Sequence, residues 1–504
     1  MEIKSDLYDF YSDDMLKAEI PQEKTFVSIL IADEWDMRKI LPILREKRWK
    51  NVYIVLNDAS EKLMSSFKLP DFRSVFPENT YIFASTQEMQ EFFKKDASAY
   101  LPRKVISASD VDYKALIREI HSERIKEKQC ANRIFLSICI PSFNRGDRAL
   151  QAVRHALRIE YDAEIEIIVS NNGSTIGKNE YRQIQEIEDS RIQYYEFDEN
   201  KGYAANICRC LEVARGQFAV LFSDEDYLNI ENLGAALDYL ETTSDLGYCY
   251  FQSTDHEIEE KDIKIYEKGL EAVIQAYKAS YFTGNCYNMN YLKEMDLCNR
   301  VKPFYNNQYF KDYAQCAFAI LLSEQHNLEM VGIELWRAGE TALTHDWGTE
   351  KGNLFSVYMP ERRLQQERGN MEFAKATFLK EDDLKKIFFL RIRDYFYYMA
   401  LYYNMRGAQM KELYSWLDIW LLHYKNCMEI LKDVMQSESP QVVQEMDEIF
   451  FYWLNCKMIQ GWFTPEENLK ANLQVVLIEY YYRKKKSVLE INYDEIAQKV
   501  QRLL

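Results

Sequence analysis

The segment IFLSICIPSFNR, residues 134–145, sets the pattern for the centre of this chain. Its first seven residues form an apolar run, which ends in a proline followed by polar residues. Two later segments have the same form, EIIVSNNGS at residues 166–174 and FAVLFSDED at residues 218–226. Short apolar runs that end in turn residues, separated by helical stretches, predict parallel β-strands joined by helices. Ligands bind outside the carboxyl ends of such strands, so these polar ends predict a binding site.

Four motifs of this region follow one another in order. They are IPSFNR at 140–145, IVSNNGST at 168–175, NKGYAAN at 200–206, and ARG at 214–216 leading into FSDED at 222–226. Together they resemble the family 2 glycosyltransferases of the GT-A fold, over about residues 135–347. The GYAAN and FSDED forms are similar to the abequosyltransferase-like branch. The resemblance implies an α/β domain of the nucleotide-diphospho-sugar transferase type, which moves a sugar from a nucleoside diphosphate to an acceptor hydroxyl.

The acidic triplet at 224–226 is the candidate metal site. Mn²⁺ and Mg²⁺ prefer oxygen ligands, and either ion can stabilise a departing diphosphate as a Lewis acid. Strand alternation would put Asp224 and Asp226 on the same side. Alignment of the family pattern Asp-x-Asp-Asp on Leu228 places Ser223 at the first Asp. We therefore expect Asp226 to bind the metal and Asp224 to bind the metal or the ribose, and we leave the role of Glu225 open. The alternative is that the triplet is an acidic, solvated turn that binds no ligand.

The ends of the first two strands are expected to hold the nucleotide, through Pro141, Ser142, Asn144, Arg145, Asn171, Asn172 and Gly173. Asn171 stands where the family commonly has an aspartate that faces the base. An amide can accept from uracil N3–H and can also donate, so UDP is the default and other bases stay open. An ordinary loop would be the interpretation of 171–173 taken alone.

Two further segments are expected to meet the donor. Lys201 precedes a predicted helix at 202–214, where a diphosphate or its sugar would be favoured, and a solvated lysine is the alternative. The segment FTGNCY at 282–287, with Gly284 and Asn285, resembles the small-residue segment that lines the donor sugar in the family.

The candidate general base is Asp312. Inverting members of the family carry a Glu-Asp pair before a helix, and its aspartate deprotonates the acceptor. Here Lys311 replaces the glutamate while the aspartate is kept. The alternative is that Asp312 caps the following helix, and both roles could hold. His345, in THDW at 344–347, falls where many GT-A enzymes place a metal-binding histidine, although a hydrogen-bonded loop histidine is as good an interpretation.

Composition restricts the class of protein. The chain has 504 residues, with 63 Lys and Arg against 80 Asp and Glu, a net charge of −17. Such a chain does not favour nucleic acid as a partner. It has no apolar run of membrane-spanning length and no signal peptide, so we expect a cytoplasmic protein with any membrane contact peripheral, at the inner face. The ten cysteines are scattered, without a CxxC pair or the His/Cys spacing of a zinc site, and are interpreted as small buried residues.

Three domains are expected from the length and the change in pattern. Residues 1–131 predict a small Rossmann-like α/β domain with strands at 26–32, 51–57, 81–84 and 104–107, and no phosphate-binding glycine motif. Residues 132–355 form the predicted GT-A domain. Residues 356–504 predict an all-helical domain with helices at 382–403, 411–435, 442–458 and 465–486. Its many aromatic residues are expected to serve the core or a homo-oligomer contact rather than sugar binding.

These patterns predict a metal-dependent, inverting glycosyltransferase with Mn²⁺ or Mg²⁺ as cofactor. The acceptor would be a hydroxyl on a glycan, a lipid-linked intermediate or a protein. One alternative is a nucleotidyltransferase that makes sugar nucleotides, but PSFNRGDR at 141–148 is not the glycine-rich basic loop which that chemistry uses. The other is a catalytically silent, glycan- or partner-binding protein on the same fold, which Ser223, Asn171 and Lys311 leave open.

Overall fold

The computed structural model describes residues 23–24, 28–34, 39–40, 49, 51–57, 80–96, 99, 101–128, 134–159, 165–243, 245–253, 263–277, 281–339, 359–378, 380–405, 415–436, 439–454, 465–485, 488 and 490–503. By internal contacts the chain divides into two compact units. Unit 2 comprises the described residues within Ile20–Tyr305 and Tyr313–Trp347. Unit 1 comprises Asn306–Asp312 and the described residues within Gly348–Leu504. The division into three domains stays a prediction.

Unit 2 contains a small parallel sheet near the N-terminus, in the order β4-β3-β2-β5. Its elements are β2 (Ser28–Ala32), β3 (Val52–Val55), β4 (Thr80–Phe83), β5 (Pro102–Ser107), α5 (Thr86–Lys95) and α6 (Tyr113–Lys128). Strands β2 and β3 are buried along their whole length, which explains their uninterrupted apolar sequence. At their ends Asp33 accepts hydrogen bonds from the backbone and side-chain nitrogens of Asn57, at 2.8 and 3.0 Å.

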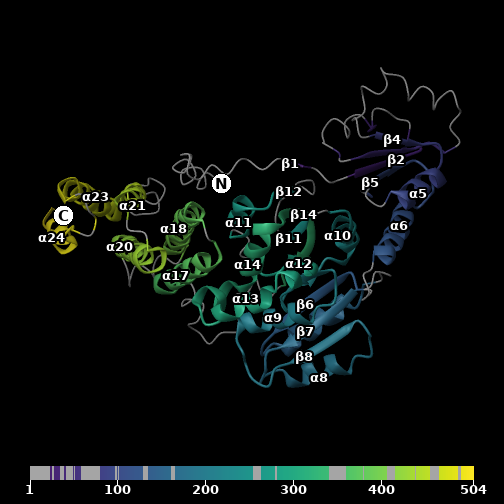
Figure 1. Cartoon of the computed structure of the whole chain (residues 1–504), viewed down its shortest axis with the longest axis horizontal. Coiled ribbons are helices and arrows are strands. Elements are labelled where there is room, and N and C mark those ends of the chain that lie inside the picture. Colours follow the sequence, from purple (N-terminus) through teal and green to yellow (C-terminus); the bar gives the residue numbers. More distant parts are fainter. Residues whose placement is uncertain are drawn as a thin grey trace, which may run out of the picture. The chain divides into compact units, whose positions relative to one another are not determined.

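A ten-stranded mixed sheet forms the centre of unit 2, in the order β1-β12-β14-β11-β13-β9-β6-β7-β8, with β10 paired to β14. Strands β6, β7 and β8 lie side by side (Figure 1) and are parallel to one another and to β9. Strand β13 pairs antiparallel with both β9 and β11. The strands are β1 (Glu23–Lys24), β6 (Leu136–Ser142), β7 (Ile165–Asn171), β8 (Ile192–Glu196), β9 (Phe218–Leu221), β10 (Tyr227–Leu228), β11 (Leu246–Ser253), β12 (Ile263–Tyr266), β13 (Asn285–Asn288) and β14 (Asn327–Arg337).

Helices connect these strands and cover the sheet. They are α7 (Gly146–Ala156), α8 (Lys178–Glu186), α9 (Tyr203–Val213), α10 (Ile230–Thr242), α11 (Leu270–Ala276), α12 (Met289–Glu294), α13 (Leu297–Val301), η1 (Lys302–Phe304) and α14 (Gln308–Gln325). Helices α7 and α9 pack on β6 and β7, whose residues are nearly all buried. The predicted α/β sheet is confirmed, and the polar ends of β6, β7 and β9 lie along one edge of it because these strands are parallel and adjacent.

From Pro360 onward, the described residues of unit 1 form helices and the short connections between them (Figure 1). Its helices are α17 (Pro360–Thr377), α18 (Glu381–Met405), α20 (Trp416–Glu429), the π-helical turn η2 (Ile430–Met435), α21 (Pro440–Leu454), α23 (Pro465–Lys485) and α24 (Tyr493–Leu503). Aromatic side chains fill its interior: Phe396 stacks on Trp453 with ring centroids 4.2 Å apart, and Trp420 donates to the carbonyl of Phe450. The predicted helical region is confirmed. Within the described residues, every helix is too short or too polar to span a bilayer.

Candidate functional site

The first carboxylate of the acidic triplet is bound to the end of β6. Asp224 is 6% exposed and accepts a hydrogen bond from Ser142 Oγ at 2.7 Å. The guanidinium of Arg145 lies 3.3 Å from its other oxygen. Burial raises the pKa of Asp224, and the opposing effects of Arg145 and Ser142 do not cancel it. Two predicted nucleotide contacts, Ser142 and Arg145, are thus in contact with a predicted metal ligand.

The middle carboxylate is neutralised by two arginines. Glu225 forms ion pairs with Arg145 and with Arg148, the latter at 2.5 Å. Sequence reasoning missed Arg148, although the string RGDR at 145–148 puts it within the first turn of α7, beside the end of β6. Since both arginines already hold Glu225, it is a poorer metal ligand than its neighbours.

The third carboxylate, Asp226, is 3% exposed. It accepts hydrogen bonds from the Thr283 hydroxyl and, at 3.4 Å, from the Gly339 backbone N–H. The described residues supply no basic side chain in ion-pair contact with it. Burial raises the pKa of Asp226 to about 6; the two hydrogen bonds lower it, and the neighbouring carboxylates of Glu225 and Asp224 raise it further. A buried carboxylate that has no basic partner and lies beside other carboxylates is a suitable ligand for a hard divalent cation, whose positive charge would compensate it.

The triplet does not continue the strand. Strand β9 ends at Leu221, and the backbone N–H of Asp226 donates to the carbonyl of Ser223 at 3.2 Å, so residues 223–226 form a turn. The expectation that strand alternation sets the direction of Asp224 and Asp226 was therefore wrong. The turn, together with Ser142 and Thr283 on other elements, sets their positions instead.

The predicted nucleotide cradle is a hydrogen-bonded loop system. Asn144 has a left-handed backbone (φ 58°), and its Oδ1 accepts from the backbone N–H groups of Thr175 and Ile176 at 2.8 and 3.1 Å. Asn171 is buried; its oxygen accepts from the Ser174 N–H at 3.1 Å and its amide donates to Tyr194 at 3.0 Å. Both polar atoms of Asn171 thus already have protein partners. Pro141 lies inside β6, just before Ser142.

The loop that leads into α9 is fixed by Asn172. Its amide nitrogen donates to Asn200 Oδ1 and to the Gly202 carbonyl, and its oxygen accepts from the Lys201 N–H at 3.0 Å. Gly173 (φ 67°) lies against this loop, and a Cβ there would come within 2.4 Å of the Glu199 carbonyl carbon, so only glycine fits. The Lys201 side chain is half exposed, 2.6 Å from the carboxylate of Glu199.

The segment around Gly284 supports the acidic turn. Gly284 has φ 95°, and a Cβ there would lie 2.3 Å from the Phe251 carbonyl oxygen. Asn285 is fully buried; it donates to the carbonyls of Tyr281 and Phe282, both at 2.6 Å, and accepts from the Tyr248 hydroxyl. Asn285 therefore shapes this segment from within. The residue of the segment that contacts the acidic turn is Thr283, whose hydroxyl donates to Asp226 and which was not predicted as a site residue.

Asp312 belongs to unit 1, and the unit boundary falls directly after it. Its carboxylate accepts from Arg362 at 2.5 and 3.2 Å, from Gln366 at 2.6 Å and from Gln308 at 2.8 Å. Helix α14 is broken just beyond it, at Tyr313 (φ −140°, ψ 36°).

Asp312 does not cap the helical segment that follows the break at Tyr313. Within the described residues its carboxylate accepts hydrogen bonds from the side chains of Arg362, Gln366 and Gln308, and from no backbone N–H of that segment. Its partners Arg362 and Gln366 are some fifty residues away in the sequence, and no local motif points to them. His345 lies outside the described residues.

Residues 137–290 match the model of the glycosyl transferase family 2. A dolichyl-phosphate beta-glucosyltransferase of Saccharomyces cerevisiae is 27% identical over 132 residues, covering 24% of this chain and 39% of that protein. The abequosyltransferase RfbV of Salmonella typhimurium is 26% identical over 118 residues, 23% of this chain and 35% of its own length. This chain thus spans well under half of both relatives.

A relative matched over most of its length is the GalNAc(5)-diNAcBac-PP-undecaprenol beta-1,3-glucosyltransferase of Campylobacter jejuni. It is 24% identical over 299 residues, which cover 56% of this chain and 86% of that protein. Among solved structures, S. aureus TarS 1-349 in complex with UDP-GlcNAc aligns with 73% of this chain and 92% of its own at a TM-score of 0.42 and 14% identity. That likeness is too low to bear on function. The abequosyltransferase-like assignment is supported only over a short segment. The family-model match supports a glycosyl transferase family 2 domain over residues 137–290, and the sheet around it has a GT-A-like α/β fold.

Proposed function

We propose that this chain is a metal-dependent, inverting glycosyltransferase that moves a sugar from a nucleoside-diphosphate donor to a hydroxyl. The observation that carries the proposal is the contrast among the three carboxylates after β9. Asp224 and Glu225 are paired with arginine, whereas Asp226 is buried with no basic partner among the described residues. Burying an unpaired charge is costly, and a divalent cation would compensate it.

The donor would lie along the edge formed by the ends of β6, β7 and β9. Asp226, with Asp224, would hold Mn²⁺ or Mg²⁺, whose charge stabilises the departing diphosphate when the ion is bound. Arg145 pairs with Asp224 and Glu225 through one nitrogen and is 28% exposed, so its other N–H groups would bind a phosphate at the same place. Lys201, just ahead of α9, would contribute a second positive charge.

UDP remains the first nucleotide to test. Asn171 Oδ1 accepts one hydrogen bond inside the protein, and an amide oxygen has a second lone pair that can accept from uracil N3–H.

Asp312 is the proposed base. In a single displacement the acceptor oxygen forms a bond to the anomeric carbon, its proton passes to the Asp312 carboxylate, and the bond between that carbon and the diphosphate breaks. Arg362 and Gln366 position the carboxylate in the present structure. The proposed acceptor is a hydroxyl of a glycan, lipid-linked intermediate or protein, and lipid-linked acceptors come first because two of the relatives are named for polyprenyl phosphates.

A second candidate function is a catalytically silent binding protein on the same fold. It is favoured by the arginines that neutralise Asp224, Glu225 and Asp312. Such a protein would leave these ion pairs intact and would not need a metal.

Calorimetric titration with UDP and GDP, with and without Mn²⁺, distinguishes the two functions. The enzyme is expected to bind nucleotide at least tenfold more tightly with Mn²⁺, and Asp226→Asn should abolish that dependence without abolishing folding. A screen of donor hydrolysis across nucleotide sugars would then identify the sugar. Nucleotide binding that is absent, or equal with and without metal, would refute the enzyme.

A further inference from the structure

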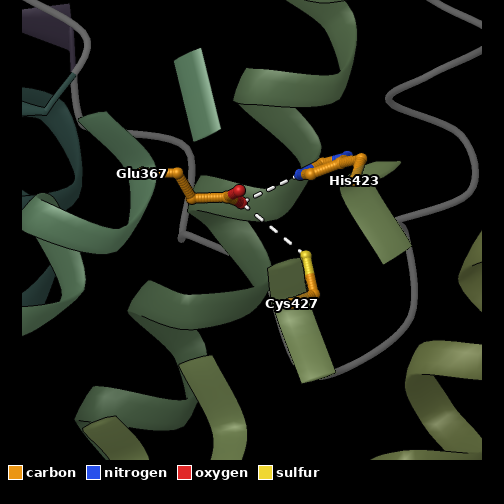
Figure 2. Close-up of side chains that lie close together, drawn as sticks. All are labelled: Glu367, His423 and Cys427. Atoms are coloured by element: carbon orange, nitrogen blue, oxygen red, sulfur yellow. Dashed lines mark hydrogen bonds and ion pairs between the residues drawn. The ribbon is translucent and has the colours of Figure 1, made fainter. Parts of the chain in front are cut away.

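Three potential metal ligands meet inside the helical part of unit 1. Glu367 lies on α17, while His423 and Cys427 lie four residues apart on α20 and therefore on the same face of that helix (Figure 2). Glu367 and His423 are both 0% exposed, and so is Cys427. Within the described residues, this is the one group of three or more histidine, cysteine and acidic side chains whose ligand atoms lie close enough together to share one ion.

The distances are close to those of a tetrahedral zinc site. His423 Nε2 is 2.9 Å from Glu367 Oε1, Cys427 Sγ is 3.8 Å from the same oxygen, and the three ligand atoms all lie within 4.8 Å of one another. Zinc bond lengths of about 2.1 Å to N or O and about 2.3 Å to S imply ligand separations of roughly 3.4–3.7 Å. The Cys427–Glu367 separation is already close to this range, and the His423–Glu367 separation would have to increase by roughly half an ångström.

The surroundings of Glu367 also suit a cation. Its second oxygen accepts from the Asn426 amide at 2.8 Å, which fixes the plane of the carboxylate and directs Oε1 toward His423 and Cys427. A buried carboxylate needs positive charge or several donors. A divalent ion bound to the carboxylate and to a Cys427 thiolate would leave the cluster with no net charge.

Without an ion the thiol is expected to keep its proton. Burial raises the pKa of Cys427 well above the ordinary range, and the Glu367 carboxylate raises it further. A bound cation reverses this effect because it stabilises the thiolate directly.

We propose that Glu367, His423 and Cys427 form a zinc site that fastens α17 to α20. A thiolate and an imidazole favour Zn²⁺ over Mg²⁺ or Mn²⁺, so this site is distinct from the one proposed at Asp226. Three protein ligands leave one position of the ion for another group. The site would fix α17, whose residues Arg362 and Gln366 hold Asp312. The competing account is a metal-free cluster in which Glu367 simply accepts hydrogen bonds.

The test uses the full-length chain purified without a histidine tag. Elemental analysis should find about one zinc per chain, and removal of zinc by a strong chelator should lower the melting temperature, which added Zn²⁺ should restore. Replacement of the ion by Co²⁺ should produce the intense near-ultraviolet absorption of a cobalt–thiolate bond. The carboxylates near Asp226 cannot produce that band, so it reports on Cys427.

Two variants and one control complete the design. Cys427→Ser should lose the cobalt–thiolate band, whereas Cys249→Ser, which removes a buried cysteine from β11, should keep it. Glu367→Gln should weaken zinc binding more than ~100-fold, beyond the 10–100-fold typical of losing a group that only hydrogen-bonds to a ligand. If the variants fail to fold, the zinc content, the cobalt–thiolate band and the melting temperature of the wild-type chain still distinguish a zinc site from a metal-free cluster. No zinc, no cobalt–thiolate band and a melting temperature indifferent to chelator and Zn²⁺ would establish the metal-free cluster.

Discussion

Asp226→Asn should make the folded protein more stable at neutral pH while it destroys the proposed metal site. The folded-state pKa of Asp226 is about 6, above the ordinary value of 3.8, so the folded protein binds this proton more tightly than the unfolded chain does. The stability contributed by the proton is fully present below pH 3.8 and is lost as the pH rises through about 6. At pH 7 the charged carboxylate therefore costs about 3 kcal/mol, at about 1.4 kcal/mol per pKa unit.

The asparagine removes that cost but changes one hydrogen bond. Its oxygen can still accept from Thr283, while its amide nitrogen cannot accept from the Gly339 N–H, a loss of about 1 kcal/mol. The net expected gain is about 2 kcal/mol at pH 7. At pH 4 the wild-type carboxyl is already protonated, so the gain should vanish and the lost Gly339 hydrogen bond should leave the variant less stable by up to about 1 kcal/mol.

Differential scanning calorimetry of wild type and variant at pH 4 and pH 7, without divalent metal, measures this difference. Unfolding of a chain with two units need not be two-state, so the comparison rests on the transition in which the variant differs. Added Mn²⁺ should then stabilise wild type at pH 7 and leave the variant unchanged. A variant that is equally or less stable than wild type at pH 7 would show that Asp226 is not a strained, uncompensated carboxylate, and the metal assignment would lose its main support.

Three further substitutions test the other parts of the site. Asp312→Asn should lower turnover by ~10²–10⁴ with nucleotide affinity preserved; full turnover would remove Asp312 from the role of base. Thr283→Val removes the hydroxyl that lowers the pKa of Asp226, so the carboxyl should be protonated at a higher pH. Because Mn²⁺ needs the carboxylate, Mn²⁺ binding measured by electron paramagnetic resonance should weaken at a higher pH than in wild type, and an unshifted pH profile would contradict this. Gly173→Ala combines a left-handed backbone with a Cβ 2.4 Å from Glu199, so it should lower the free energy of unfolding by ~1–3 kcal/mol, and a silent result in urea titration would show that the 199–202 loop can move aside.

The parallel sheet and the order of its polar ends could be predicted from sequence because both are local. An apolar run that stops at Pro141 or at Asn171 marks its own end, and parallel pairing then brings the ends together. The starts of two helices, predicted at 442 and 465, lie at Pro440 and Pro465, because a proline favours the first turn of a helix.

What could not be predicted depends on contacts between distant segments. Nothing near Asp226 in the sequence indicates Thr283, fifty-seven residues away, and nothing near Asp312 indicates Arg362. A structural role of Asn171 and Asn172 was also not predicted. Both were expected to face the nucleotide, yet their amides fix the loops at 174 and 200–202, so they shape the proposed nucleotide site even where they do not touch a ligand.

The Glu367–His423–Cys427 cluster shows why a zinc site can be absent from a motif search. The cysteines were interpreted as small buried residues because the chain has no CxxC pair and no His/Cys spacing of a zinc site, and Cys427 is indeed buried and free of disulfide. A four-residue separation between His423 and Cys427 has meaning only if the segment is a helix, since only then do both side chains face the same way. The third ligand comes from α17, fifty-six residues earlier, and its position depends on how two helices pack. A site assembled by helix packing is thus visible only after the fold is known, whereas a site at parallel strand ends, such as that of Asp224 and Asp226, can be predicted before it.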